Sequence, residues 1–144
     1  MLILNIDKTA IVNFISNMIY LTRRERFSAA HRLCQPGLSD EENLERYGQC
    51  ANPSWHGHNY VLWVTVKGEV RKEHGYVVDL KDISNILKDK IITKLDHKNI
   101  NLEVDFMADK VASTENIAIG IWNEIEADIA KLGVKLHCIK LQET

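Results

Sequence analysis

The sequence predicts an α+β domain with two helices packed on one face of an antiparallel sheet. Three observations predict this class: strand-like runs near both ends and in the middle of the chain, two amphipathic helical runs between them, and no internal repeat or linker. With 144 residues, 45% of them hydrophobic and 26% charged, the chain is long enough for one domain with a real core.

The first predicted strand is YLTRRERF at 20–27, continued by SAAH as far as His31. A short helix follows in SDEENLERYG, because Ser39 can cap its start, Glu42 stands at the capping-box position and Gly48 can close its end. This helix leads the chain to Cys50.

The strongest strand pattern is NYVLWVTVKGEV at 59–70. If the strand begins at His56, then His56 and His58 point to the same face, about 7 Å apart along the strand, with the alternate apolar residues behind them. A turn around 73–75 then leads into a short predicted strand, YVVD at 76–79.

Asp79 can cap a helix in which apolar residues recur at helical spacing as far as Ile91. A polar loop, LDHKNIN at 95–101, comes next. A second helix is predicted from Ser113 or Thr114 to a stop at Gly133, and the run at 134–144 is a final strand.

Residues 1–19 lack a clear periodicity, and we expect a loosely ordered extension there, followed by a single domain over 20–144. We see no signal peptide and no membrane span. A net charge of -2 with both signs interspersed offers no basic stripe for nucleic acid. The widely spaced Cys34, Cys50 and Cys138 predict free thiols and a cytoplasmic protein, with Cys34 and Cys138 as buried, inert thiols.

Two histidines on one strand face are typical of a metal site. Catalytic zinc usually takes three protein ligands and keeps a fourth position open, and His31, at the end of the first strand, is the best candidate to join His56 and His58. The alternative is a closed structural site that recruits Cys34 and Cys50, although neither cysteine has a partner at short C-x-x-C spacing.

Several motifs together resemble one family. They are FSAAHRL at 27–33, LSDEENLERYGQC at 38–50, HGHNY at 56–60, LDHKN at 95–99, STEN at 113–116 and QET at 142–144. In this order they resemble the 6-pyruvoyltetrahydropterin synthase family over about residues 20–144.

The resemblance implies the tunnelling fold (T-fold) and a homo-hexamer, a dimer of trimers whose sheets join into barrels, with active sites at subunit interfaces. It implies zinc held by His31, His56 and His58. The implied reaction is a carbon–oxygen lyase step in tetrahydrobiopterin biosynthesis, in which 7,8-dihydroneopterin triphosphate, a small pterin substrate, yields 6-pyruvoyltetrahydropterin and triphosphate.

Position by position, the resemblance makes Cys50 the proton-abstracting base, Asp96 and His97 its partner pair, and Glu143 the acid that recognises the pterin. Thr114 and Glu115 resemble further pterin-contacting positions, although helix capping would also explain them. An unassisted cysteine, with an ordinary pKa of about 8.5, is a poor base, and a histidine oriented by an aspartate can assist it. We expect the pair to come from an adjacent subunit.

Two other functions stay open: a 6-carboxytetrahydropterin synthase activity, whose family has a shorter interval from cysteine to HGH than the five residues seen here, and a catalytically weak zinc-binding module. Two departures from the family suggest the second of these alternatives. Trp55 stands where the family commonly has glycine, and it can crowd the loop beside the zinc. The family also continues into a further strand after ET, which predicts a weaker hexamer and Glu143 near a fraying end.

Overall fold

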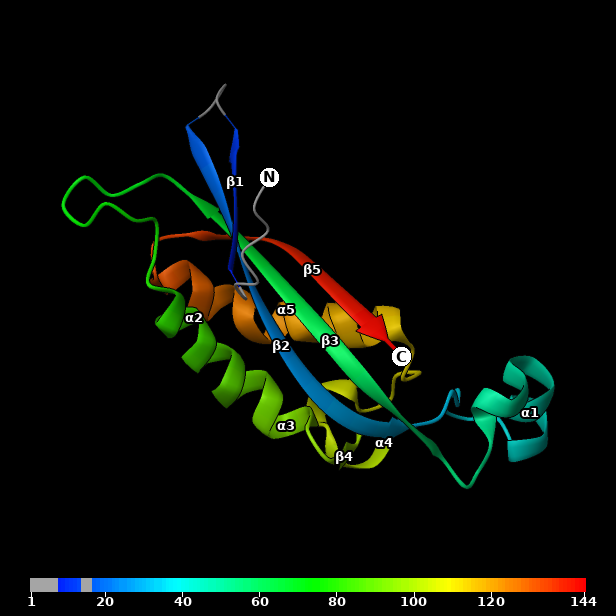
Figure 1. Cartoon of the computed structure of the whole chain (residues 1–144). Coiled ribbons are helices and arrows are strands. Elements are labelled where there is room, and N and C mark those ends of the chain that lie inside the picture. Colours follow the sequence, from blue (N-terminus) through cyan, green and yellow to red (C-terminus); the bar gives the residue numbers. More distant parts are fainter. Residues whose placement is uncertain (1–7, 14–16) are drawn as a thin grey trace.

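A mixed, five-stranded sheet organises the part of the chain that the computed structural model describes, residues 8–13 and 17–144 (Figure 1). The elements in chain order are β1 (Lys8–Asn13), β2 (Met18–His31), α1 (Asp40–Tyr47), the 3₁₀-helix η1 (Gly48–Ala51), β3 (His56–Gly68), α2 (Leu80–Leu87), the π-helical turn η2 (Lys88–Ile92), α3 (Thr93–Leu95), β4 (Lys98–Asn99), α4 (Ile100–Glu103), the 3₁₀-helix η3 (Asp105–Met107), α5 (Thr114–Lys131) and β5 (Lys135–Glu143).

The sheet order is β1-β2-β3-β5, and all of these neighbours are antiparallel. β4 joins β2 in parallel at the end that β1 does not cover, so the sheet is mixed, and the purely antiparallel sheet expected from the sequence is wrong at this edge. The long β2–β3 ladder runs from Ile19 opposite Gly68 to His31 opposite His56. The ladder therefore ends on two of the predicted metal ligands.

The core lies between one face of the sheet and the helices. Alternate residues of β3 from Tyr60 to Val66 are fully buried, as the period of two predicts. They pack in one cluster with apolar residues of the α2–η2–α3 rod and of α5, among them Ile83, Leu87, Ile117 and Ile121. Each such side chain contributes about 1.5–3 kcal/mol when fully buried. The two predicted helices on one face are confirmed, although the first is built from three consecutive helical segments.

Capping residues begin the helices where the sequence predicts. Ser39 and Glu42 form both hydrogen bonds of a capping box, Asp79 accepts from the amide of Lys81, and Ser113 accepts from the amide of Asn116. Because these caps fix where the segments start, they also fix where Cys50 and Thr114 lie.

Other expectations need correction. The segment YVVD is not a strand: Tyr76 forms a single bridge with Arg71, and Val77 and Val78 are both buried, whereas a strand would alternate them. The predicted loop at 95–101 contains β4 and the start of α4. Part of the extension expected over residues 1–19 lies outside the described residues. In the part that is described, residues 8–13 form strand β1.

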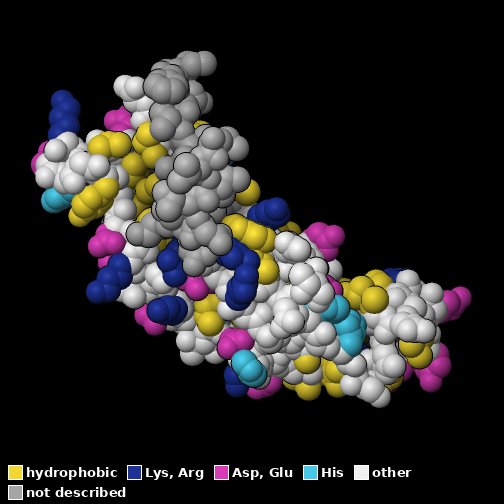
Figure 2. Space-filling view, viewed as in Figure 1, with side chains coloured by type: hydrophobic (Ala, Val, Ile, Leu, Met, Phe, Trp, Pro, Cys, Tyr) yellow, Lys and Arg dark blue, Asp and Glu magenta, His cyan; other side chains and the backbone are white. Residues whose placement is uncertain are grey.

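Helix α1 lies beyond the end of the sheet, past the carboxyl end of β2 (Figure 1). On the face drawn in Figure 2, basic and acidic side chains are interspersed, and histidine side chains reach the surface between the sheet and α1. Among the described helices, none is both long and apolar enough to cross a membrane.

Candidate metal and active site

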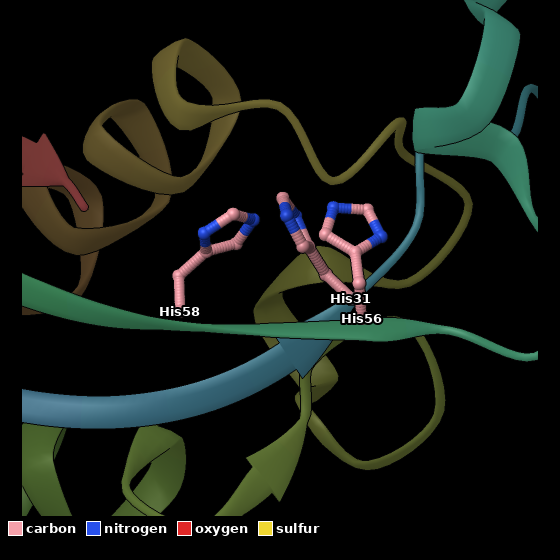
Figure 3. Close-up of side chains that lie close together, drawn as sticks. All are labelled: His31, His56 and His58. Carbon is pink, nitrogen blue, oxygen red and sulfur yellow. The ribbon is translucent and has the colours of Figure 1, made fainter.

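Three histidines converge at the end of the β2–β3 ladder. His31 comes from β2 and His56 and His58 come from β3, and their rings rise on the same side of the two strands (Figure 3). One ligand nitrogen from each lies within 4.8 Å of the others. Around a zinc ion at about 2.1 Å the nitrogens would lie roughly 3.4 Å apart, so small ring rotations complete the set. The three-histidine grouping is thus present: His56 and His58 as strand parity predicts, and His31 as the expected third member.

The surroundings of His31 and His58 fit metal ligands. His31 is buried, and its Nδ1 lies 2.7 Å from the carbonyl oxygen of Ala112; His58 Nδ1 lies 3.1 Å from the carbonyl oxygen of Thr144. Since a carbonyl only accepts, each Nδ1 carries the proton, and each Nε2 keeps a free lone pair. Histidine ligands in metal sites commonly donate their other N–H in this way.

The two Nε2 atoms are buried, and neither makes a hydrogen bond within the described residues. Glu143 Oε1 lies 3.0 Å from Nε2 of His58 and 3.6 Å from Nε2 of His31, close enough for charge interaction but without hydrogen-bond geometry. Buried polar atoms without partners are rare, and a shared cation would satisfy both. These orphaned nitrogens show that the residues present fit a metal ion.

His56 is held in the form that binds metals. Burial lowers its pKa from the ordinary value of 6.5, and electrostatic interactions with His31 and His58 lower it further, while Glu143 opposes them. A neutral imidazole is the ligand form, so fewer protons must be displaced when a cation binds near neutral pH.

Cys50 lies next to the triad without joining it. Cys50 sits in η1, is exposed and lines a small cavity of about 130 Å³; the residues around the cavity are His31, Leu33, Cys50, His56, Ser113, Thr114, Glu115 and Glu143. Cys34 is half-buried and belongs to no metal-binding group among the described residues, which disfavours the closed cysteine site. Cys138 is exposed, so its predicted burial is wrong.

Asp96 and His97 lie at a different place. The Asp96 carboxylate accepts from the amide of Ser28 at 2.9 Å, and its other oxygen lies 3.0 Å from His97 Nδ1. The Ser28 hydrogen bond is the main cause of a lowered pKa for Asp96, and His97 adds to it. The His97 side chain is 83% exposed and lines an open hollow of about 540 Å³ outside the Cys50 cavity. Within one subunit, the structure does not bring this pair to Cys50.

Glu143 and Thr114 form a pair inside the cavity. The Thr114 hydroxyl donates to Glu143 Oε2 at 2.5 Å. The end of the chain is held here, because the Thr144 amide donates to the carbonyl of Asn59 and Glu143 pairs with Tyr60 in the sheet. These contacts hold the segment in which the sequence predicted fraying. Since Ser113 caps α5, the Thr114 hydroxyl is free to serve Glu143.

Comparisons with known proteins agree with this geometry. The sequence model of the family described as 6-pyruvoyl tetrahydropterin synthase matches residues 20–144. The chain belongs to this family. It is 45% identical over 124 residues to the 6-pyruvoyl tetrahydrobiopterin synthase of Pongo abelii and 44% identical to that of Homo sapiens, covering in each case 86% of this chain and 84% of the relative. The solved 6-pyruvoyl tetrahydropterin synthase of Caenorhabditis elegans superposes with a TM-score of 0.81 at 35% identity, covering 88% of this chain and 89% of that one.

In this member of the 6-pyruvoyl tetrahydropterin synthase family, Trp55 adopts an unusual backbone conformation. Its φ is +64°, in the left-handed region that favours glycine, and its indole ring lies against the guanidinium of Arg32, 5.0 Å from ring centre to Cζ. Trp55 does not line the Cys50 cavity. The crowding expected from its size is therefore directed away from that cavity.

Sequence reasoning missed the groups that orient the ligands. The carbonyls of Ala112 and Thr144 are main-chain atoms, which carry no side-chain signal. Asn101, whose side chain holds the backbone of Arg32 through two hydrogen bonds of 3.1 Å, lies in a segment that looked like a polar loop.

Proposed function

We propose that this chain is a zinc-dependent lyase that converts 7,8-dihydroneopterin triphosphate to 6-pyruvoyltetrahydropterin and triphosphate in tetrahydrobiopterin biosynthesis. The observation that carries the proposal is the triad of His31, His56 and His58, with two buried Nε2 atoms that make no hydrogen bond within the described residues, beside a cavity that contains a cysteine. The family of the chain supports the choice of reaction.

The roles of the residues follow from their chemistry. Zinc at the triad would supply Lewis-acid polarisation of the substrate's side-chain oxygens, which acidifies the neighbouring C–H bonds. Cys50, at the wall of the same cavity, would take the proton from that carbon as its thiolate. The electron pair left on carbon then expels triphosphate. Tautomeric shifts of hydrogen, first within the side chain and then from the side chain to the C=N bond of the dihydropterin ring, produce the two side-chain carbonyls and the tetrahydropterin ring. No external oxidant or reductant enters this balance.

Glu143 would orient the pterin ring. A carboxylate can accept two adjacent N–H groups of a pterin edge in a bidentate pair, which fixes the ring in its plane. The hydroxyl of Thr114 holds Oε2 of Glu143, so the carboxylate is already oriented before the substrate binds. Glu115, at the wall of the same cavity, would make a further contact to the ring.

A neighbouring subunit would complete the site. The cavity of about 130 Å³ is well below the roughly 300–1,000 Å³ of ordinary ligand pockets, so one subunit cannot enclose a pterin triphosphate. The exposed His97, held by the ionised Asp96, is available to activate Cys50 of another copy. We propose that the domain over 20–144 forms a homo-hexamer, a dimer of trimers whose sheets join into barrels. We also propose that the protein is located in the cytoplasm, because its three cysteines are free and the cytoplasm keeps thiols reduced.

Zinc-loaded protein incubated with 7,8-dihydroneopterin triphosphate tests the reaction. We expect triphosphate release and a 6-pyruvoyl product, both lost after chelation and restored by zinc. No release from the zinc-loaded protein would refute the proposal, and a 6-carboxy product would assign the chain to the carboxy-forming reaction instead.

The shared site has its own test. The Cys50→Ala and His97→Ala variants are each expected to be inactive, but subunits mixed in equal amounts and reassembled should recover activity in about one quarter of the sites, since random pairing leaves that share with both residues intact. If the mixture stays as inactive as the separate variants, Cys50 and His97 do not act across an interface.

A further inference from the structure

Two of the three proposed zinc ligands sit on the last rung of the β2–β3 ladder. His31 and His56 are the final pair, and strand ends open at lower free energy than the middle of a sheet. One residue beyond this rung, Arg32 and Trp55 face each other, with the guanidinium over the indole ring at 5.0 Å. The contact continues the pairing just where hydrogen bonds between the strands cease.

Arg32 is itself firmly held. Its Nη1 donates to Oδ1 of Asp40 at 3.0 Å, and its amide and carbonyl both bond the side chain of Asn101. The side chain is only 15% exposed, so its charge is largely removed from water, which strengthens a cation–π contact. The next residue, Leu33, donates its amide to the carbonyl of Cys50 at 2.8 Å. Arg32 therefore lies between a ligand, His31, and the link to Cys50.

Trp55 is in a strained conformation. A φ of +64° is costly for a bulky residue, and such strain persists where surrounding contacts compensate for it. The Trp55 amide donates to the carbonyl of Asn52 at 3.0 Å, which closes the turn before β3. The contact with Arg32 holds the other side of this turn, immediately before His56.

We propose that Arg32 and Trp55 are positioning residues whose cation–π contact, the Arg32–Trp55 clasp, holds His31, His56 and Cys50 at the spacing that metal binding and proton transfer require. The inference rests on the proposed function, because it gives the clasp a role at the zinc site of that reaction. The clasp touches no substrate; it acts through the ladder end and through the Leu33–Cys50 hydrogen bond.

A double-mutant cycle on zinc affinity tests the clasp. The variants are Trp55→Leu, Arg32→Met and the double variant, with affinity measured by competition against a chelator. We expect each single variant to bind zinc about tenfold more weakly, which equals about 1.4 kcal/mol, and the double variant to bind no more weakly than either single one. Trp55→Phe, which keeps an aromatic face, should stay close to the wild type.

Further variants separate the contact from its surroundings. Asp40→Asn removes the charge that pairs with Arg32 and should change zinc affinity less than Arg32→Met does. Trp55→Gly removes the strain together with the ring, so it should weaken zinc binding like Trp55→Leu while lowering the unfolding midpoint less. A role confined to general stability would instead make zinc affinity follow the midpoint across the series.

The chain offers a matched control on the same strand. Lys140 lies over the ring of Trp63 at 4.8 Å, and these two residues are paired across β3 and β5, away from the triad. The Lys140→Met and Trp63→Leu variants should leave zinc affinity unchanged. Equal losses in the control pair, or a double clasp variant whose loss is the product of the two single losses, would overturn the proposal.

Turnover at saturating zinc provides a second readout. Because the clasp also holds Cys50 through Leu33, we expect kcat of the Trp55→Leu variant to remain about tenfold low when zinc no longer limits, with KM changed little. If the wild type releases no triphosphate, the proposed function fails, but the zinc-affinity cycle still judges the clasp. If the wild type turns over normally and the variants match it in both readouts, the clasp alone is refuted.

Discussion

The hydrogen bond from Thr114 to Glu143 gives the sharpest prediction about substrate binding. Replacing Thr114 with Val keeps the shape of the side chain and removes the hydroxyl that donates to Oε2 of Glu143 at 2.5 Å. Helix α5 keeps its start, because the cap is Ser113. The variant therefore isolates one hydrogen bond.

The magnitude follows from the charge and exposure of the partner. Hydrogen bonds to charged groups contribute about 1.5–3 kcal/mol, and the Glu143 side chain is 26% exposed, which places this bond near the lower end. A loss of about 1.5 kcal/mol corresponds to roughly a tenfold change in binding. If Glu143 orients the pterin ring in the ground state and the transition state alike, the loss falls on KM and leaves kcat nearly unchanged.

Steady-state triphosphate release measures both constants. Thr114→Val is expected to raise KM about tenfold, and Thr114→Ser, which keeps the hydroxyl, should lie close to the wild type. Zinc affinity should change little in either variant, because neither Thr114 nor its partner Glu143 is a proposed zinc ligand. An unchanged KM in Thr114→Val, or an equal defect in Thr114→Ser, would show that the hydroxyl does not prepare Glu143 for the substrate.

Three further predictions concern the base, the ligands and the core. Cys50→Ala should lower kcat by about 10²- to 10⁴-fold with zinc still bound, whereas His56→Ala should lose both activity and zinc. Metal analysis and turnover measurements check both variants. Zinc loss from Cys50→Ala would instead favour a closed cysteine site. Because the folded-state pKa of His56 lies below 6.5, His56 should cost the zinc-free protein no stability at a pH well above 6.5, where it is neutral in both states. As the pH falls through 6.5 the unfolded state takes up a proton and stability should decrease, until the pH passes the folded-state pKa. Denaturant titrations between about pH 5 and 8 should show a shallower loss in His56→Ala, and identical slopes would contradict the shift. Gly120→Ala would place a methyl group 2.6 Å from a ring carbon of Phe106, so overpacking of about 1–3 kcal/mol should exceed the helix-propensity gain of about 1 kcal/mol and lower the thermal midpoint; an unchanged midpoint would show that the ring moves aside.

Local patterns were sufficient for the elements that carry the ligands. The parity of His56, His58 and Tyr60 predicted one strand face, and the structure places both histidines on it, where His31 of the neighbouring strand joins them. The caps at Ser39 and Ser113 predicted two helix starts within a residue, because a cap is a contact between neighbours in sequence. Where a feature depends on residues close together in the chain, the sequence alone was enough.

Features built from distant residues were not predictable in this way. β4 pairs in parallel with β2, although Lys98 and Ala29 are far apart in sequence and two residues are too few for a strand pattern. Val77 and Val78 suggested a strand by composition, yet both are buried in a connecting segment, since the core closes over them. The carbonyl of Ala112 orients His31 from another element, and a main-chain atom is the same at every residue.

Trp55 shows how a departure from a family pattern changes meaning once its backbone is known. A tryptophan in place of glycine suggests crowding when only side-chain size is considered. A φ of +64° explains why glycine suits the position, and also why a large residue there needs a compensating contact. That contact is Arg32, which follows one histidine of the triad in sequence just as Trp55 precedes another. The two departures from ordinary geometry, a strained backbone and a cation removed from water, face each other one residue beyond the last rung, and together they stabilise the end of the ladder on which the metal site depends.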